Sequence, residues 1–512
     1  MLPPSYLDQM PDAFVQLWQQ VEDEILQDVA RRIGKMDAVT PTANWQLWRY
    51  QQTEALRNDV VKLLAKYTGK SEAAIRRLLL QAATEAMERE DTIYYHYGKE
   101  PQPFEESAAL NNLLDAGARQ TCGTWQNLTA TTANTVTGAF ERTLDAAWLK
   151  VSTGAFDYKT AVKQAVDSLA DDMPMVTYPS GHKDSIEVAA RRAVLTGVNQ
   201  TCGKLQEARM DEMGCEFVET TAHGGARPSH AAWQGRRFHR GGAVDYKGKH
   251  YPDFEAATGY GTGAGLCGWN CRHTFFAVFP ELGDPPQWTQ EQLRELNARN
   301  IEWNGKKYTA YEISQMQRAR ERNVRRWKKR YLAEDAAGLD PTDAAVRLKA
   351  ARQSLAEFAQ ATGGRVDSAR VSVPKFGRSE GSKSSWAAKG YEKQQKDAII
   401  IENLRTAAKL PKAAVIHLEP TKINVDALTF DDAHINAERE HRVSEEQAKQ
   451  YIRNAKISVS VWNGQFERYY GTEGAAYVNT IKHEIRTAYS RAEFDENTTA
   501  LIEEMKKNGI LG

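Results

Sequence analysis

The sequence predicts a multidomain α+β protein with a mainly helical N-terminal half and a compact C-terminal domain that contains an antiparallel sheet. Three observations support this prediction. Apolar residues recur at helical spacing over the first third of the chain, a segment rich in Gly, aromatic and Cys/His residues follows, and alternating apolar residues mark strands near the C-terminus. The length of 512 residues allows roughly three or four domains.

The composition is that of an ordinary globular chain. Lys and Arg together number 67, as do Asp and Glu, so no net charge draws the whole molecule onto nucleic acid or an acidic membrane. No apolar run reaches the roughly 18 residues of a membrane span, and no signal peptide is recognisable, so we expect synthesis in the cytoplasm. Five cysteines are too few, and odd in number, for a secreted disulfide framework, so reduced thiols are expected.

Residues 1–175 are predicted to form stacked helices. Apolar residues recur every three or four positions from Phe14 onward, which indicates amphipathic helices. One helix is expected to end at Gly69 and the next to begin at Ser71 as its N-cap. The Ala/Thr-rich stretch 121–156 predicts another helix, whose small residues would let a neighbouring helix approach closely.

Residues 176–286 are predicted to form a small α+β segment rich in Cys and His. A helix over 186–213 is expected to end at Gly214, and a strand is expected over 217–221. The remainder, 223–286, has few periodic runs and therefore no long amphipathic element to bury. It must be held by specific contacts.

Residues 287–362 are predicted to form a hairpin and basic helices. Asn304 and Gly305 are typical of a hairpin turn. Between Arg318 and Arg330 there are eight Lys or Arg and one Glu, a local charge of +7. Two interpretations stay open for this helix, a solvated face or a contact with nucleic acid or an acidic protein surface.

Two further segments complete the chain. Residues 363–395 are predicted to be a linker because they are rich in Gly, Ser and Pro. Residues 396–512 are predicted to form a compact α+β domain. Alternating apolar residues over 457–461 and further strand-like runs up to Ser490 describe an antiparallel meander, and a helix over 496–507 closes the domain.

The Cys/His-rich segment carries the thiols and imidazoles that tetrahedral zinc prefers. The candidate ligands among them are His223, His230, His239, Cys267, Cys271 and His273. The predicted ligands of a structural zinc ion are Cys267, Cys271 and His230 with one other histidine. The alternative is that the thiols pack as small hydrophobes and the histidines cap turns. A zinc-dependent hydrolase centred on His230 and Cys271 is a weaker alternative, because no carboxylate with general-base spacing accompanies them.

Two linked motifs lie about thirty residues apart in this segment. They read Ala222-His223-x-x-Ala226-Arg227-Pro228-Ser229-His230-x-x-Trp233-x-Gly235 and Leu266-Cys267-Gly268-x-Asn270-Cys271-Arg272-His273. In this order they resemble the signature of tailed-phage minor capsid proteins of the Mu F-like group, in particular the phage minor capsid protein 2 family, over roughly residues 1–365.

This resemblance implies a component of the phage head, present in a few copies near the portal protein and acting in head assembly or DNA delivery. The basic helix 318–330 would then face packaged DNA. The residues that the resemblance implies as holders of the fold, without a catalytic role, are Arg227, His230, Asn270, Cys271, Arg272 and His273.

A second cluster of polar residues lies in the C-terminal domain. If the chain is helical up to Val443, His434, Glu438 and His441 fall on one face at i, i+4 and i+7, with Arg439 and Arg442 beside them. A base, an acid and two guanidiniums suit transphosphorylation of RNA, in which the 2′-hydroxyl loses a proton and the phosphate gains charge. The alternatives are a solvated mixed-charge helix and metal binding by His434, Glu438 and His441.

The order of elements in this domain, ending in Thr487-Ala488-Tyr489, resembles the small nuclease domains grouped with barnase, EndoU, colicin D and RelE, including versions fused behind minor capsid proteins. The resemblance implies RNA cleavage without a metal cofactor, and an immunity protein as a further partner. The catalytic set expected here is His434, Glu438, Arg439, His441, Arg442 and Thr487. Residues 391–512 carry 17 basic and 19 acidic side chains, which does not suit an indiscriminate nuclease. The alternative is a purely structural capsid protein with a catalytically inert extension.

Overall fold

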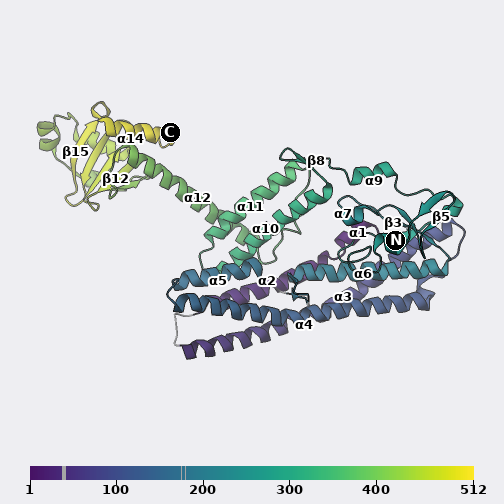
Figure 1. Cartoon of the computed structure of the whole chain (residues 1–512). Helices are drawn as coiled ribbons and strands as arrows, with labels where there is room; N and C mark the ends of the chain where they lie inside the picture. The colour runs from purple at the N-terminus through teal and green to yellow at the C-terminus, as the bar shows by residue number, and fades with distance from the viewer. Residues whose placement is uncertain (37–41, 174–175, 179, 512) are drawn as a thin grey trace. The chain divides into compact units, whose positions relative to one another are not determined.

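The computed structural model describes residues 1–36, 42–173, 176–178 and 180–511. The chain divides into two compact units, which are treated separately below: unit 1, Met1–Ala387, and unit 2, Ala388–Gly512 (Figure 1). The expected multidomain α+β fold is confirmed. The domain boundary expected at residue 175 lies outside the described residues. Within the described ranges, no helix has the length and apolar character needed to cross a membrane.

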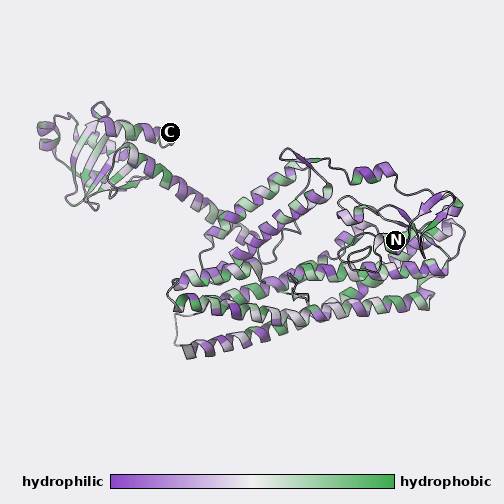
Figure 2. Cartoon of the chain, viewed as in Figure 1, coloured by the Kyte–Doolittle hydropathy of each residue, from purple (hydrophilic) through white to green (hydrophobic). Residues whose placement is uncertain are grey.

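Unit 1 consists mainly of long helices. Their bounds are α1 (Pro4–Gln9), α2 (Asp12–Gly34), α3 (Thr42–His96), α4 (Ala108–Ser152), α5 (Tyr158–Asp172), α6 (Ile186–Glu212), α7 (Pro228–Ala231), α8 (Phe254–Thr258), α9 (Gln290–Leu296), α10 (Ala310–Ala336) and α11 (Thr342–Ala361). Helices α2, α3, α4 and α6 lie side by side (Figure 1). Hydrophobic and hydrophilic residues are intermixed along each of them (Figure 2), as expected of amphipathic helices that bury one stripe.

The strands of unit 1 are short and lie mostly in the Cys/His-rich segment. They are β1 (Val176–Thr177), β2 (Lys183–Asp184), β3 (Phe217–Thr220), β4 (Arg237–His239), β5 (Val244–Tyr246), β6 (Lys249–Tyr251), β7 (Phe275–Ala277), β8 (Ile301–Trp303) and β9 (Lys306–Tyr308). Strand β3 is the centre of an antiparallel sheet in the order β4-β3-β7, and the other strands pair as hairpins. The hairpin β8-β9 turns at Asn304 and Gly305, as predicted.

Helix α3 is continuous through Gly69 and Ser71, so the helix boundary expected there is wrong. The Ser71 hydroxyl donates a hydrogen bond to the carbonyl oxygen of Tyr67, four residues earlier, at 2.7 Å, and the residue is buried. The hydroxyl is therefore satisfied inside a helix and does not cap a new one.

Two hydrophobic cores meet along α3. Leu56 and Leu79 of this helix belong to the first core, which fills the space between the long helices. Tyr94, near its end, belongs to the second core, whose other members include Cys267, Cys271, Phe275 and Phe279 under the small sheet. The ring centroids of Tyr94 and Phe279 lie 5.9 Å apart in an edge-to-face arrangement.

Helices α4 and α6 approach each other closely at a pair of reciprocal contacts. A Cβ atom placed on Gly117 of α4 would lie 2.2 Å from Oγ1 of Thr201 on α6. One placed on Gly197 of α6 would lie 2.4 Å from Oγ1 of Thr121 on α4. Each helix thus presents a glycine to the threonine of the other, and neither glycine has room for a side chain.

The basic helix α10 is not a free positive face. Its cations form ion pairs with carboxylates on other helices of unit 1, namely Lys329 with Glu22, Arg325 with Glu187, Arg326 with Asp171, and Arg330 with Asp167 and Asp171. Arg320 covers the ring of Phe358 on α11, with its guanidinium carbon 4.1 Å from the ring centroid. The positive charge of this segment is therefore used mainly inside unit 1.

The predicted linker 363–395 is partly ordered on unit 1 and partly helical. Phe376 packs edge-on against Tyr331 of α10 at 5.6 Å between centroids, and Lys328 donates to the carbonyl oxygen of Val371 at 2.5 Å. A helix, α12 (Arg378–Ala407), begins inside the expected linker. The stretch before α12 is therefore held by α10, because apolar side chains interrupt its Gly- and Ser-rich composition.

Unit 2 contains a six-stranded sheet in the order β10-β12-β13-β14-β15-β11. Its elements after α12 are β10 (Val415–His417), β11 (Thr429–Phe430), the π-helix η4 (Ala433–Glu438), α13 (Glu445–Arg453), β12 (Ile457–Val461), β13 (Phe466–Tyr470), β14 (Gly474–Asn479), β15 (Glu484–Ser490) and α14 (Glu496–Lys507). The predicted antiparallel meander is confirmed for β12 to β15. Leu404 of α12 and Met505 of α14 belong to one core of this unit, and Ile452 of α13 belongs to another.

Candidate functional site

Three buried side chains of the Cys/His-rich segment converge in unit 1. His230 lies on α7, and Cys271 and His273 lie in the loop before β7. The two Nδ1 atoms of His230 and His273 are 3.4 Å apart, and Sγ of Cys271 is 3.7 Å from each of them. All three side chains are at most 2% exposed. These three residues are called the His–Cys group below.

The hydrogen bonds of the two rings assign their protons. Nε2 of His230 lies 2.9 Å from the carbonyl oxygen of Ala264, and Nε2 of His273 lies 3.0 Å from Oε1 of Gln234. That amide oxygen also accepts from the backbone N–H of His223 at 3.1 Å, which fixes the orientation of the amide. Both Nε2 atoms therefore carry the ring proton, and both Nδ1 atoms present lone pairs to each other and to Cys271.

The lone pairs of the group outnumber its protons. Burial lowers the pKa of both His230 and His273 and raises the pKa of the Cys271 thiol, so all three side chains are neutral near pH 7. One S–H then faces two nitrogen acceptors, and it can satisfy only one of them. A buried acceptor without a donor is costly, and a cation placed between the three atoms removes that cost.

The distances within the group fit a tetrahedral metal. Ligands of zinc at its usual bond lengths are about 3.3 Å apart for two nitrogens and about 3.6 Å apart for nitrogen and sulfur. The observed separations of 3.4 Å and 3.7 Å are close to these values. The outer hydrogen bonds of the imidazoles are also those that metal-binding histidines make. The His–Cys group can therefore hold a metal ion.

Cys267 lies outside the His–Cys group. Its Sγ is 3.7 Å from the carbonyl oxygen of His273, and its buried side chain packs in the second core as a small hydrophobe. The structure thus brings together the expected ligands His230 and Cys271 with His273, which fits the further histidine of the expected set, whereas Cys267 lies apart.

The other residues of the two motifs connect this segment to its surroundings. Arg227 donates to the carbonyl oxygen of Trp269 at 2.8 Å and so joins the first motif to the second. Arg272 lies 3.5 Å from a carboxylate oxygen of Asp8. Asn270 adopts a positive φ of 54°, which is suited to the tight turn before Cys271.

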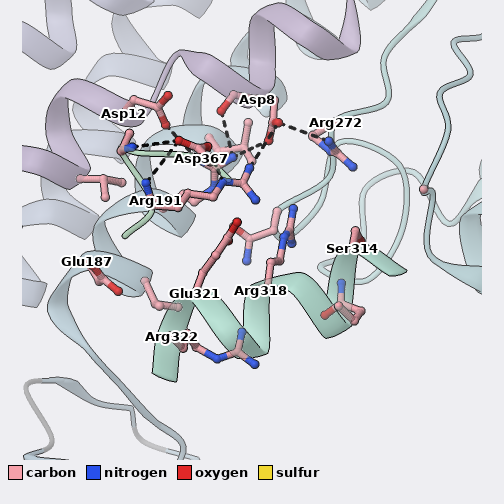
Figure 3. Close-up of a pocket in the computed structure, with 18 of the residues that line it drawn as sticks. Asp8, Asp12, Glu187, Arg191, Arg272, Ser314, Arg318, Glu321, Arg322 and Asp367 are labelled. Atoms are coloured by element: carbon pink, nitrogen blue, oxygen red, sulfur yellow. Dashed lines mark hydrogen bonds and ion pairs between the residues drawn. The ribbon is translucent and has the colours of Figure 1, made fainter. Parts of the chain in front are cut away.

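The His–Cys group borders a cavity of about 440 Å³ in unit 1. The cavity is lined by residues of α1, α2, α6 and α10 and by the loops that contain the two motifs. Figure 3 shows Asp8 and Asp12 opposite Arg318 and Arg322 of α10, with Arg272 beside Asp8.

In unit 2, the helix expected up to Val443 ends early. η4 stops at Glu438, and both Glu440 and Arg442 have positive φ values, so the backbone leaves the helical path. His434 and Glu438 still lie one turn apart, with Nδ1 2.6 Å from the carboxylate. The single face expected for His434, Glu438 and His441 is therefore not formed, because the turn carries His441 elsewhere.

His441 instead contacts the last part of the sheet. Its Nδ1 is 2.6 Å from a carboxylate oxygen of Glu493, and its ring centroid is 5.5 Å from that of Tyr489 on β15. The hydroxyls of Tyr489 and Tyr477 are 2.7 Å apart. Thr487 is the register partner of Tyr477, so its side chain lies on the same face of the sheet.

Arg439 and Arg442 are both exposed and follow η4. The sheet offers another cation near the tyrosines. The guanidinium of Arg468, on β13, lies 4.9 Å from the ring centroid of Tyr477. A histidine with a carboxylate partner, hydroxyls and a guanidinium thus meet on one face of the unit 2 sheet. This set is called the His441 face below.

The profile of the family described as phage minor capsid protein 2 matches residues 2–360, which is more than half of the chain. The chain belongs to this family. A structural protein of Lactococcus phage LL-H is 27% identical over 254 residues, which cover 46% of this chain and 63% of that relative. The chain therefore spans less than two thirds of the relative's length. No solved structure shows a significant match.

Membership of the phage minor capsid protein 2 family makes the chain a structural component of a phage virion. The resemblance inferred from the two motifs is thereby confirmed for the capsid part. The match ends at residue 360, so it covers the His–Cys group and most of the residues around the cavity but not unit 2.

Sequence reasoning missed two amides that hold the motif segment of this family member. Asn199 of α6 is buried and donates to the carbonyl oxygens of Cys271 and His273 at 2.9 and 3.0 Å. Gln206, two turns further along α6, donates to the carbonyl oxygen of Phe275 at 2.9 Å. Their spacing of seven residues in the sequence could have indicated them, because it places both amides on the same face of the helix, which is buried.

Proposed function

We propose that this minor capsid protein acts near the portal protein in assembly of the phage head, and that a zinc ion in the His–Cys group stabilises its unit 1. The observation that carries the proposal is the family match over residues 2–360, which contains both motifs. Zinc suits a donor set of two imidazoles and one thiolate, and a water molecule or a further protein group would complete its coordination.

The surface of unit 1 offers apolar side chains for such a partner. On α3, Leu47, Tyr50 and Val61 are 58%, 63% and 49% exposed, and their spacing places them on one side of the helix. Clusters of exposed apolar residues are typical of protein contacts. We assign this side of α3 to the portal.

Packaged DNA, the partner expected for residues 318–330, does not form part of this proposal. Four of the eight cations in this segment, Arg325, Arg326, Lys329 and Arg330, are paired with Glu22, Glu187, Asp167 and Asp171 inside unit 1. A DNA contact would have to compete with these ion pairs.

The test is co-purification of the full chain with the cognate portal protein. Tyr50→Asp should reduce the amount retained at least tenfold, because it introduces a charge into the apolar surface. Leu282→Asp is the matched control, since Leu282 is similarly exposed, at 57%, on a different part of unit 1. Absence of the chain from proheads and virions would contradict the assembly role.

A second function is proposed for unit 2, cleavage of RNA without a metal, and the observation that favours it is the His441 face. Glu493 orients His441, which can take the 2′-hydroxyl proton as a general base, while Arg468 can offset charge on the phosphate. Thr487 would contact the substrate from the same face. An immunity protein would then be the expected partner of this unit.

This second proposal is tested with the full chain and total RNA in EDTA. His441→Ala should lower the cleavage rate at least about a hundredfold, as loss of a general base typically does. His434→Ala should have a smaller effect, because His434 pairs with Glu438, whereas the ring of His441 contacts Tyr489. Two results together would contradict this proposal: total RNA stays intact with the purified chain, and a host without an immunity gene tolerates expression of the chain. Unit 2 would then be an inert extension.

A further inference from the structure

Arginines gather around one carboxylate in the cavity next to the His–Cys group. Asp8 lies 2.7 Å from Arg191, 3.5 Å from Arg272 and 3.6 Å from Arg370. These three arginines come from α6, from the second motif and from the segment after α11. Their charges hold the pKa of Asp8 below its usual value, against the opposing effect of burial.

Arg318 is the fourth arginine of this cluster, and it has no carboxylate partner among the described residues. Its Nε is buried and makes no hydrogen bond within the described part of the chain. Burial and the nearby Arg370 and Arg272 lower the pKa of its guanidinium. Figure 3 shows Arg318 reaching from α10 toward the cavity. Arg318 as a whole is half-buried, and a partly desolvated guanidinium without a partner is costly unless a bound anion pairs with it.

The cavity as a whole carries an excess of positive charge. Its lining contains seven arginines and five carboxylates, an excess of two positive charges. A bound anion would offset this excess.

We infer that this cavity binds the phosphate group of a small molecule, with Arg318 as a principal contact and Arg272 and Arg370 beside it. A phosphate monoester or free phosphate carries close to two charges at neutral pH, and guanidinium groups bind its oxygens in pairs. The volume of about 440 Å³ accepts a ligand up to the size of a nucleotide. Apolar side chains in the lining, such as Val15, Val188 and Leu195, would contact the rest of such a ligand.

The experiment is isothermal titration calorimetry of the full chain with three probes: inorganic phosphate, pyrophosphate and ADP. Binding of all three with similar affinity would identify the phosphate group alone as the ligand, and tighter binding of ADP would identify a nucleotide. Arg318→Gln should weaken the tightest probe at least tenfold, because a charge-assisted contact is lost. Arg326→Gln, on the same helix but outside the cavity lining, should leave affinity unchanged.

Two further measurements separate binding from folding. Arg318→Gln should melt at the same or a higher temperature than the parent in phosphate-free buffer, because it removes a half-buried charge that has no carboxylate partner among the described residues. It should also lose the stabilisation by phosphate. Asp8→Asn should bind phosphate more tightly, since it frees three guanidiniums from a competing carboxylate. No binding of any probe at millimolar concentration, or equal binding by the parent and Arg318→Gln, would overturn the inference.

Discussion

The ammonium group of Lys329 lies 2.5 Å from a carboxylate oxygen of Glu22, although 307 positions separate the two residues in the sequence. The side chains of both residues are nearly buried, and Glu187 and Asp23 also raise the pKa of Lys329 against the effect of burial. This cluster joins α10 to α2 and α6. Lys329 belongs to the basic segment for which the sequence allowed an external partner, but its charge is used in a structural contact within unit 1.

Replacement of Lys329 by Met should destabilise unit 1 by about 3–5 kcal/mol, because it leaves Glu22 buried without its cation and leaves Glu187 with Arg325 alone. Urea unfolding of the full chain, followed by circular dichroism, measures the loss. Lys204→Met, at an exposed position of α6, is the control and should change the free energy of unfolding by less than about 0.5 kcal/mol. Equal stability of Lys329→Met and the parent would contradict the role of this ion pair.

Asp23 should contribute to the pH dependence of the free energy of unfolding. Burial raises the pKa of Asp23 from 3.8 to about 7, and Lys329 only partly opposes it. Because the pKa is raised on folding, the folded state binds more protons between these two values, and the contribution of Asp23 to stability decreases as the pH rises through that range. Asp23→Asn should therefore stabilise the chain at pH 8 by at most about 4 kcal/mol.

The measurement is urea unfolding of Asp23→Asn and the parent at pH 5 and pH 8. The difference between the two proteins isolates Asp23 from Asp91 and Glu334, whose pKa values burial also raises, to about 6 and about 7. A stability difference that is the same at both pH values would show that Asp23 is ionised throughout.

The metal site distinguishes two cysteines that lie four positions apart. The parent should carry close to one equivalent of zinc, and Cys271→Ser should lose both the metal and folding stability, because metal binding and folding are coupled. Cys267→Ser should keep the metal, since the Cys267 thiol faces a carbonyl oxygen and not the imidazoles. Elemental analysis and thermal melting check both variants. Retention of zinc by Cys271→Ser, or a folded parent without metal, would contradict the assignment.

The contact between α4 and α6 gives a matched pair of glycine substitutions. Gly117→Ala places a methyl group against Thr201 and should cost about 1–3 kcal/mol through overpacking. Gly123→Ala, on the same helix with no atom within 4 Å of the new Cβ, should be neutral or stabilise by up to about 1 kcal/mol. The difference in melting temperature between the two variants measures how tightly the helices pack. Equal melting temperatures would show that α4 can shift away from α6.

Much of the fold follows from local patterns in the sequence. The strands β12 to β15 and the helix α14 lie where alternation and helical spacing predict them, because each buries one face of a local element. The boundary expected at Gly69 and Ser71 was wrong because tertiary packing overrides a local capping signal when the serine hydroxyl can bond the preceding turn.

The candidate sites were harder to predict because they depend on contacts between distant segments. His230 and Cys271 were recognised by their chemistry, but only the fold shows that His273 completes the group while Cys267 faces a carbonyl oxygen. Arg318 and Asp8 are 310 positions apart in the sequence, and no local pattern links them. Likewise, the positive φ values of Glu440 and Arg442 break a helix that residue spacing alone would have continued.

Helix α3 has 55 residues without a break, and its side chains enter both cores of unit 1. If either core unfolds, part of α3 must unfold with it, and the other core then loses the side chains that α3 contributes to it. Unit 1 should therefore lose its structure in a single cooperative transition, without a stage in which the small sheet survives alone. A partner that binds the exposed apolar side chains of α3 and displaces this helix would, for the same reason, also displace Tyr94 and the sheet next to it.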